Sequence, residues 1–331
     1  MQSEGEGSTL DRCANCGVAA VDGIKLKDCS ACHLVRYCCI KCQKEHRPKH
    51  KKECKQRAAE LRDELLFKQP ECSNYGDCPI CCLPMELDPK LSTLRSCCGQ
   101  LLCVGCSQAG MMQEILGRGQ YDCKCPFCRE INPKSSKEID MRLMKRAESS
   151  DPISLVEIGK RYYGKGDYAK AFQSWTKAAA LGSAESHYSL SILYGKGHGV
   201  EKDKKNEMFH LEEAAIGGHP LARYNLGCLE KERRRHDRAV KHWIIAANLG
   251  HDTSLDALKK VYRVGLVSKE DFASALRGHQ AAVDAMKCPR REAGALLAQW
   301  GEDRKKDKNA RLSESQCLMV CRAFSTPSST L

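Results

Sequence analysis

Aromatic residues are scarce in this sequence, at 6% of 331 positions, and no apolar run approaches the length of a membrane span. A transmembrane helix needs about 20 consecutive apolar residues, so we expect no membrane partner. The opening segment MQSEGEGSTLDRC is acidic and polar and lacks the apolar core of a secretory signal. We therefore expect an intracellular protein in a reducing compartment, cytoplasm or nucleus, that is not secreted.

Cysteine is abundant instead: of 23 cysteines, 19 lie at or before Cys128. Thiols in a reducing compartment stay reduced, which argues against a disulfide framework. Most of these cysteines recur as C-x-x-C doublets, and two thiolates at that spacing can bind one tetrahedral Zn²⁺. The spacing therefore predicts zinc as the cross-link of the N-terminal part of the chain.

The formal net charge of +12 raises the question of nucleic-acid binding. Fifteen zinc-bound thiolates and four Zn²⁺ would lower that charge to about +5. The basic cluster RPKHKKECKQR has no interleaved aromatic residues on which bases could stack. The sequence thus argues against nucleic acid and favours proteins as partners.

Residues 11–56 carry eight metal-ligand candidates, which are Cys13, Cys16, Cys29, Cys32, Cys38, Cys42, His50 and Cys54. Four-residue steps place Cys42, His50 and Cys54 on one face of a helix. His46 lies on the same face and could replace His50 in a shifted site. Cys54 pairs better with His50, at one turn's spacing. We therefore interpret His46 as a surface histidine.

This segment resembles the MYND zinc finger, whose two C-x-x-C pairs are followed by Y-C-x-x-x-C-Q and H-x-x-x-C. The resemblance implies interleaved pairs, with Cys13, Cys16, Cys38 and Cys42 on one zinc and Cys29, Cys32, His50 and Cys54 on the other. Arg47 stands where the family usually has tryptophan, which argues against carrying over its proline-rich-peptide groove. Cys39, next to a ligand, is expected to be a small buried residue.

Residues 73–135 carry a second set of eight, which are Cys78, Cys81, Cys97, Cys98, Cys103, Cys106, Cys125 and Cys128. Their order resembles a RING finger, which implies one zinc on Cys78, Cys81, Cys103 and Cys106 and a second on Cys97, Cys98, Cys125 and Cys128. Most RING fingers carry a histidine near the position of Gln100. Adjacent Cys97 and Cys98 need an unusual local backbone to share one metal, and Cys123 is a possible substitute ligand.

In RING ubiquitin ligases, residues equivalent to Ile80 and Pro126 contact the ubiquitin-conjugating enzyme, and one equivalent to Arg129 bridges it to ubiquitin. Such a module positions the thioester-linked ubiquitin and needs no nucleophile of its own, so we expect no catalytic residue. The alternative is that these residues pack the zinc loops and that the module only binds proteins.

Residues 151–290 contain a repeat. The segments WTKAAALGSAESHYSLSILY, LEEAAIGGHPLARYNLGCLE and WIIAANLGHDTSLDALKKVY align without gaps, at intervals of 36 and 32 residues, which predicts stacked helical hairpins. Gly182, Gly218 and Gly250 fit the left-handed position that ends a helix. The segment resembles Sel-one-like repeats, relatives of tetratricopeptide repeats, which implies a solenoid that binds proteins.

The sequence thus predicts a multidomain chain: two small zinc-stabilised cross-brace modules followed by an all-α helical-repeat solenoid. The connecting parts are expected as a disordered tail (1–10), a linker helix (57–72), a linker (136–150) and a flexible C-terminal tail (291–331). Four Zn²⁺ are expected, two per module. The first functional hypothesis is a protein-interaction adaptor, and the alternative is a RING-type ubiquitin ligase whose repeats recruit substrate.

Overall fold

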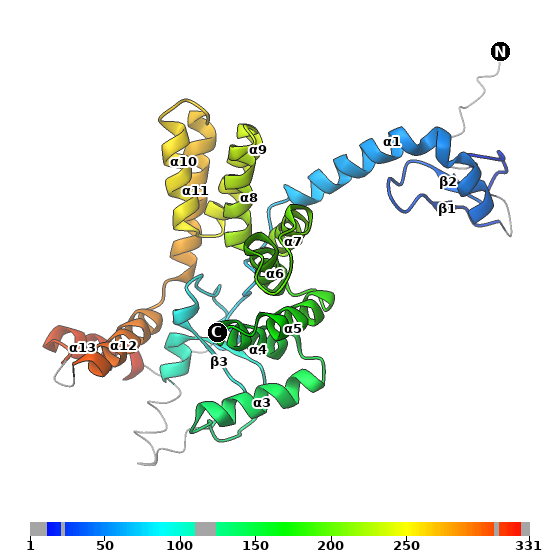
Figure 1. Ribbon diagram of the computed structural model, residues 1–331. Helices are drawn as coiled ribbons and strands as arrows, with labels where there is room; N and C mark the ends of the chain where they lie inside the picture. Colours follow the sequence, from blue (N-terminus) through cyan, green and yellow to red (C-terminus); the bar gives the residue numbers. More distant parts are fainter. Residues whose placement is uncertain (1–11, 21–23, 110–123, 308–310, 326–331) are drawn as a thin grey trace. The chain divides into compact units, whose positions relative to one another are not determined.

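The computed structural model describes residues 12–20, 24–109, 124–307 and 311–325 (Figure 1). The tail predicted at residues 1–10 lies outside these ranges, as does Cys123. The chain divides into two compact units, Met1–Lys68 and Gln69–Leu331.

The first unit is built from a two-stranded sheet and one long helix. Strand β1 (Lys27–Asp28) pairs antiparallel with β2 (Arg36–Tyr37), and helix α1 runs over Ile40–Leu66. The sequence predicts a linker helix over residues 57–72, and α1 runs through the first part of that range without a break and ends at Leu66. The reason is local, because the run of Lys, Glu, Arg, Ala and Leu after Cys54 favours helix and contains no breaker.

The second unit begins with the second cysteine-rich module. A short 3₁₀ helix, η2 (Pro89–Leu91), leads into strand β3 (Ser92–Leu94), which pairs antiparallel with β4 (Leu101–Cys103). Residues 104–109 continue as helix. The module's small core holds Met85 and Leu102 beside its cysteines.

A stack of helices follows, and Figure 1 shows α4 to α11 as antiparallel pairs. The region predicted as a linker is helix α3 (Ser136–Glu148), because Ser135 caps its N-terminus and Leu143 is fully buried on it. The repeat helices are α4 (Pro152–Gly164), α5 (Tyr168–Ala180), α6 (Ala184–Lys196), α7 (Lys204–Ile216), α8 (Pro220–Glu232), α9 (His236–Asn248), α10 (Asp252–Tyr262) and α11 (Lys269–Met286). The structure thus has candidate zinc modules followed by a helical solenoid, which is the architecture that the sequence predicts.

Glycines end the second helix of successive hairpins, as the repeat alignment predicts. Gly182, Gly218 and Gly250 have φ values of 86°, 80° and 88°, which lie in the left-handed region. Repeat-equivalent alanines, Ala178 and Ala214, are fully buried and let neighbouring helices approach closely.

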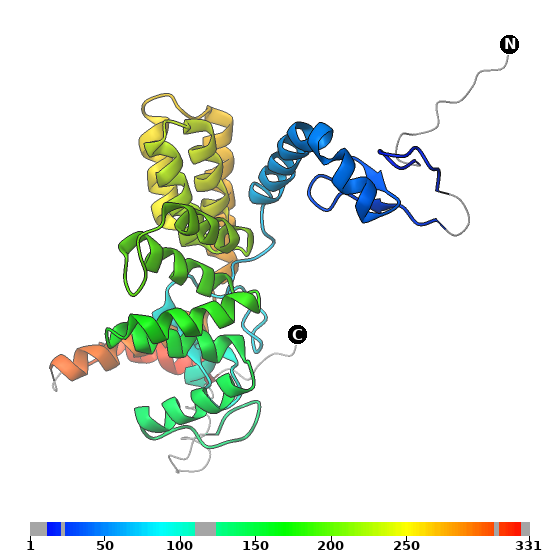
Figure 2. The same cartoon turned by 45° about the vertical axis from the view of Figure 1, so that its right-hand side comes forward.

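The C-terminal part departs from the prediction of a flexible tail, because its described residues, 291–307 and 311–325, contribute to two helices. These are α12 (Pro289–Lys306) and α13 (Glu314–Ser325), which pack against each other (Figure 2). Ala293, Val320 and Ala323 form a small buried cluster between them. These apolar residues recur at helical spacing within a charged segment, so the segment's composition hides them.

Candidate metal centres

Among the described residues, four groups of cysteine and histidine side chains converge, and within each group the ligand atoms lie within 4.8 Å of one another. They are Cys13, Cys16, Cys38 and Cys42; Cys29, Cys32, His50 and Cys54; Cys78, Cys81, Cys103 and Cys106; and Cys97, Cys98, Cys125 and Cys128. The structure therefore brings together all sixteen predicted ligands, in the interleaved grouping that the two family resemblances imply.

The sulfur positions suit tetrahedral zinc. Thiolates bound at about 2.3 Å to a tetrahedral ion stand about 3.8 Å apart. The Sγ atoms of Cys16 and Cys38 are 3.6 Å apart, and those of Cys29 and Cys54 are 3.7 Å apart. In the second module, Cys81 Sγ lies 3.9 Å from Cys103 Sγ. Zinc therefore fits both the size and the chemistry of these sites.

Crowding of the thiols gives a further reason for a cation. Burial raises the pKa of Cys54, and the neighbouring Cys29 and Cys32 raise it further, to about 12. Burial also opposes ionisation of Cys13, but backbone amides of Cys16, Cys38 and Asn15 lower its pKa to about 6. A divalent ion allows all the thiols of a group to ionise together, because it offsets their mutual repulsion.

The first C-x-x-C of each site folds into the same turn. The amide of the residue four positions after the first cysteine donates to that cysteine's carbonyl oxygen, over 2.8 to 3.0 Å. That residue always has a left-handed backbone: Gly17 (φ 75°), His33 (55°), Cys82 (53°) and Arg129 (62°). The repeated turn shows that the second module uses the same local device as the first.

Within these four groups of described residues, His50 supplies the one imidazole. It lies on α1 one turn before Cys54, is buried, and places its Nε2 3.1 Å from Cys32 Sγ. His46 stacks on His50 and its Nδ1 is 3.1 Å from the hydroxyl of Tyr37, so it is half-buried instead of a free surface residue. The sequence predicts its exclusion from the metal group but not this supporting contact.

Cys39 is expected from the sequence to be buried, but the structure exposes it at the N-cap of α1. Its sulfur lies 3.5 Å from the amide nitrogen of Cys42 and accepts from it. The prediction is wrong because the residue precedes a helix start, where a side chain turns back toward the first amides and solvent.

The adjacent cysteines of the fourth site are held by a tight turn. The amide of Gly99 donates to Arg95 O over 2.7 Å, and Gly99 has a φ of 74°. This turn is the unusual backbone that the sequence requires, and both Cys97 and Cys98 direct their sulfurs into the group. Cys98 Sγ lies 3.6 Å from Cys125 Sγ.

The residues expected to contact a ubiquitin-conjugating enzyme lie on the surface of the second module. Ile80, Pro126 and Arg129 are all exposed. Arg129 also has a left-handed backbone, in the turn that begins at Cys125, so its backbone has a structural role whatever its side chain does.

Two buried arginines of this unit escape detection in the sequence. Arg95 donates to Ser107 Oγ and to Asn132 Oδ1, at 3.2 Å each, and so links the turn before Cys97 to the segment after Cys106 and to the segment after Cys128. Arg291 on α12 contacts Cys81 and Leu83, in the loop that carries the first cysteine pair of the second module. A single arginine belongs to no repeating pattern, so its burial and its contacts cannot be predicted from the periodicity of the sequence.

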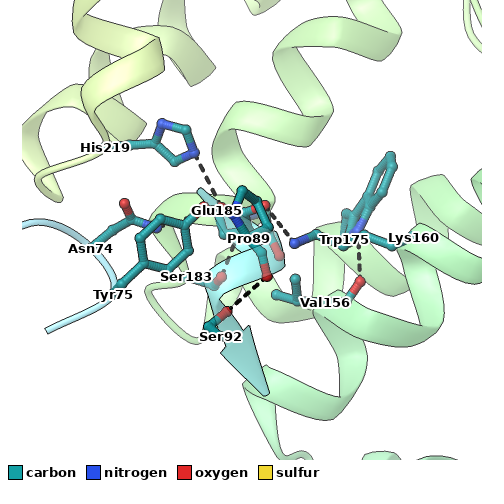
Figure 3. Close-up of polar contacts among 11 residues, drawn as sticks. Asn74, Tyr75, Pro89, Ser92, Val156, Lys160, Trp175, Ser183, Glu185 and His219 are labelled. Carbon is teal, nitrogen blue, oxygen red and sulfur yellow. Dashed lines mark hydrogen bonds and ion pairs between the residues drawn. The ribbon is translucent and has the colours of Figure 1, made fainter. Parts of the chain in front are cut away.

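The second module is joined to the repeats by a polar cluster around Glu185, at the start of α6 (Figure 3). The carboxylate of Glu185 accepts from Lys160 over 2.7 Å and from Tyr75 over 3.3 Å, and it lies 3.1 Å from His219. Asn74 adds a backbone bond, with its amide 3.1 Å from Gly218 O. Burial, and then the negative charge of Glu185, raise the pKa of Tyr75.

A groove of about 570 Å³ opens beside this joint. Ser92, Leu94 and Leu101 line it from the β3–β4 hairpin. Its other wall is solenoid and includes Pro152, Ile153, Val156, Leu181 and Lys160. Ile153 and Leu181 are exposed apolar residues on its lining, so the groove offers both an apolar wall and a charged end at Lys160 and Glu185.

The family model for the MYND finger matches residues 13–54. A protein of Helicobacter pylori (strain J99), named "Putative beta-lactamase HcpC", is 38% identical over 55 residues, which cover 17% of this chain and 19% of that protein. The chain thus spans about a fifth of that relative's length in the matched part.

Two solved structures are also similar. A Sel1 repeat protein from Oxalobacter formigenes matches with a TM-score of 0.41 and 24% identity, over 51% of this chain and 50% of its own. A protective antigen of uropathogenic Escherichia coli strains, displaying an SLR fold, matches with a TM-score of 0.36 and 18% identity, over 63% and 42%.

Among the described residues, none of the helices combines the length and apolar character needed to cross a lipid bilayer. The convergent ligands, the repeated zinc turns and the family match lead to one conclusion about the N-terminal unit. Residues 13–54 are a MYND finger, a zinc-binding module that precedes a second cysteine-rich module and a helical solenoid.

Proposed function

We propose that this chain is a zinc-stabilised adaptor that assembles protein partners, and that it works in a reducing compartment where its thiols stay available to metal. Two features support the proposal. A MYND finger and a helical solenoid occur in one chain, and stacked helical repeats expose extended surfaces suited to protein binding.

The observation that carries the proposal is the groove between the β3–β4 hairpin and helix α4. Its volume of about 570 Å³ lies within the range of pockets that hold small ligands or short peptide segments. Exposed Ile153 and Leu181 give it apolar contact area, which single scattered surface residues do not provide. We propose a short apolar segment of a partner protein as the occupant.

A random-peptide display library, selected on the immobilised zinc-loaded chain, tests this proposal. Peptides that bind through the groove should lose affinity at least tenfold for Leu181→Asp, because a buried carboxylate would replace apolar contact. Val264→Asp is the matched control, since Val264 is an exposed apolar residue that does not line the groove. Selected peptides that bind all three proteins equally, or a failure to enrich any peptide, would contradict the groove as the partner site.

The second candidate function is RING-type ubiquitin ligation, with the repeats as the substrate-recruiting part. It is favoured by the exposure of Ile80, Pro126 and Arg129 on the second module. In this function the module would hold a ubiquitin-conjugating enzyme and contribute positioning alone.

A further inference from the structure

Arg291, at the start of α12, is a charged residue in an unusual place. Only 1% of its surface is exposed, and its guanidinium reaches the loop that carries the first cysteine pair of the second module. Nη1 donates to Pro84 O over 2.6 Å, and Nη2 donates to Leu83 O over 2.9 Å. Nη2 also lies 3.4 Å from Cys81 Sγ, a ligand atom of the third metal group.

Backbone packing brings α12 to a second part of the same metal group. Gly294 of α12 lies against Gly105, which stands between the ligands Cys103 and Cys106. A Cβ on Gly294 would lie 2.8 Å from the Cα of Gly105, and a Cβ on Gly105 would lie 2.5 Å from Arg290 O. The helix therefore contacts both cysteine pairs of one site, and only glycines permit this approach.

The charges explain why an arginine belongs there. Four thiolates around one Zn²⁺ carry a net charge of −2, and three of the four cysteines in this group are buried. A buried guanidinium offsets part of that charge, and an N–H to sulfur bond directs it at Cys81. Without the zinc-thiolate group, the same guanidinium would be a buried charge held only by carbonyl oxygens.

We propose that Arg291 supports the ligand Cys81 from outside the coordination sphere, so that zinc binding at this site and docking of α12 on the second module depend on each other. The dependence is reciprocal, as it is for any two coupled equilibria. Zinc holds α12 in place, and docked α12 slows the loss of zinc. The C-terminal helices α12 and α13 are thus part of the metal site's protection.

Zinc release from the full-length chain into a chromophoric chelator tests the first half of this coupling. Removing a partner that orients a metal ligand weakens metal binding by about 10- to 100-fold. We expect Arg291→Ala to accelerate release of one zinc equivalent by about that factor and to leave the other equivalents unchanged. Lys287→Ala is the control, because Lys287 is an exposed cation four residues away whose ion pair is with Asp284.

Gly294→Ala tests the same coupling without touching a charge or a ligand. Alanine favours helix over glycine, so the variant strengthens α12 as a helix while its Cβ pushes it away from Gly105. We expect the same single zinc equivalent to be released faster. If Arg291→Ala and Gly294→Ala both release all their zinc at the wild-type rate, the proposal is wrong.

Hydrogen exchange measures the reverse direction. In a Cys78→Ser variant, which removes a ligand of this site, amides of α12 should exchange at least tenfold faster than in the wild type, while those of α5 should not change. Unchanged exchange in α12 would show that docking is independent of the metal and would overturn the proposal. Neither readout depends on partner binding, so failure here is distinguishable from failure of the adaptor function.

Discussion

The indole nitrogen of Trp175, on α5, donates a hydrogen bond to the carbonyl oxygen of Val156, on α4, over 3.1 Å. The ring takes the space above Gly159, where a Cβ would stand 2.2 Å from that nitrogen. The tryptophan is therefore both a core residue and a polar clamp between the two helices of one repeat.

The arrangement recurs two repeats later. Trp243 Nε1 donates to Tyr224 O over 3.3 Å, and a Cβ on Gly227 would stand 2.3 Å from the indole nitrogen. Each glycine precedes its tryptophan by the same number of positions, whereas the intervening repeat has Gly195 and Leu211 at these positions. This contact fixes how closely the two helices of a hairpin can approach.

Replacing Gly159 with alanine should therefore destabilise the solenoid. Alanine gains up to about 1 kcal/mol of helix propensity, but forcing a Cβ against the buried ring costs about 1–3 kcal/mol or more. We expect a lower midpoint when unfolding is followed by tryptophan fluorescence. Gly164→Ala, in the same helix, should be neutral or stabilising, because a Cβ added there would meet nothing within 4 Å. Equal effects of the two substitutions would contradict the clamp.

The histidines of α1 should differ in their effect on metal content. We expect about four Zn²⁺ per wild-type chain and about three in His50→Ala, because only His50 directs its imidazole into a cysteine group. His46→Ala should retain about four, since His46 contacts Tyr37 instead of the group. Elemental analysis after exposure to a weak chelator measures both. A zinc lost from His46→Ala but kept in His50→Ala would reverse the assignment.

The carboxylate of Glu185 should make the joint between the second module and the repeats sensitive to acid. Burial opposes its charge, but the hydrogen bond from His219 and the charge of Lys160 lower its pKa from 4.5 to about 2. A lowered folded-state pKa stabilises the fold above pH 4.5, and that stabilisation disappears as pH falls from 4.5 toward 2. The shift corresponds to roughly 3 kcal/mol.

Glu185→Gln should accordingly lower the free energy of unfolding at pH 7, and the gap to the wild type should shrink as the pH falls below 4.5. Denaturation at a series of pH values measures this gap. Glu201→Gln, at an exposed position, should leave the wild-type pH dependence intact. A gap between wild type and Glu185→Gln that stays constant from pH 7 to pH 3 would mean that Glu185 does not act through its charge.

Ubiquitin transfer separates the two proposed functions. Under the ligase function, the zinc-loaded chain should form ubiquitin conjugates with at least one enzyme of a ubiquitin-conjugating panel, and Ile80→Ala should abolish them. Ile131→Ala is a closely matched control, because Ile80 and Ile131 of the same module are both 44% exposed. Absence of conjugates across the panel, with zinc still bound, would favour the adaptor.

Much of the metal chemistry could be predicted because zinc ligands follow short local spacings. The spacing of Cys29 and Cys32 is enough to mark both residues as candidate zinc ligands. The order of the doublets resembles that of known families, and this resemblance predicts which doublets share a metal. The repeat helices were predictable for a similar reason, since each hairpin repeats the same apolar and glycine positions.

The joints between these parts could not be predicted. Arg291 and Cys81 are separated by 210 positions, and no periodic pattern relates them. In the sequence, Glu185 is an ordinary polar residue in the first turn of a helix. In the structure, its carboxylate accepts a hydrogen bond from Tyr75 and forms an ion pair with Lys160. Long-range charged contacts depend on the finished packing, and a single chain's sequence does not contain that information locally.

Asn74 and Tyr75 attach the second module to the repeats through contacts with residues that are more than 100 positions away in the sequence. They contact the turn before α8 and the start of α6. The amide of Asn74 donates to Gly218 O, and the hydroxyl of Tyr75 donates to the carboxylate of Glu185. A segment held by a short tether acts at an effective concentration on the order of millimolar. Because Asn74, Tyr75 and Glu185 also line the neighbouring groove, a ligand bound there would contact the joint itself.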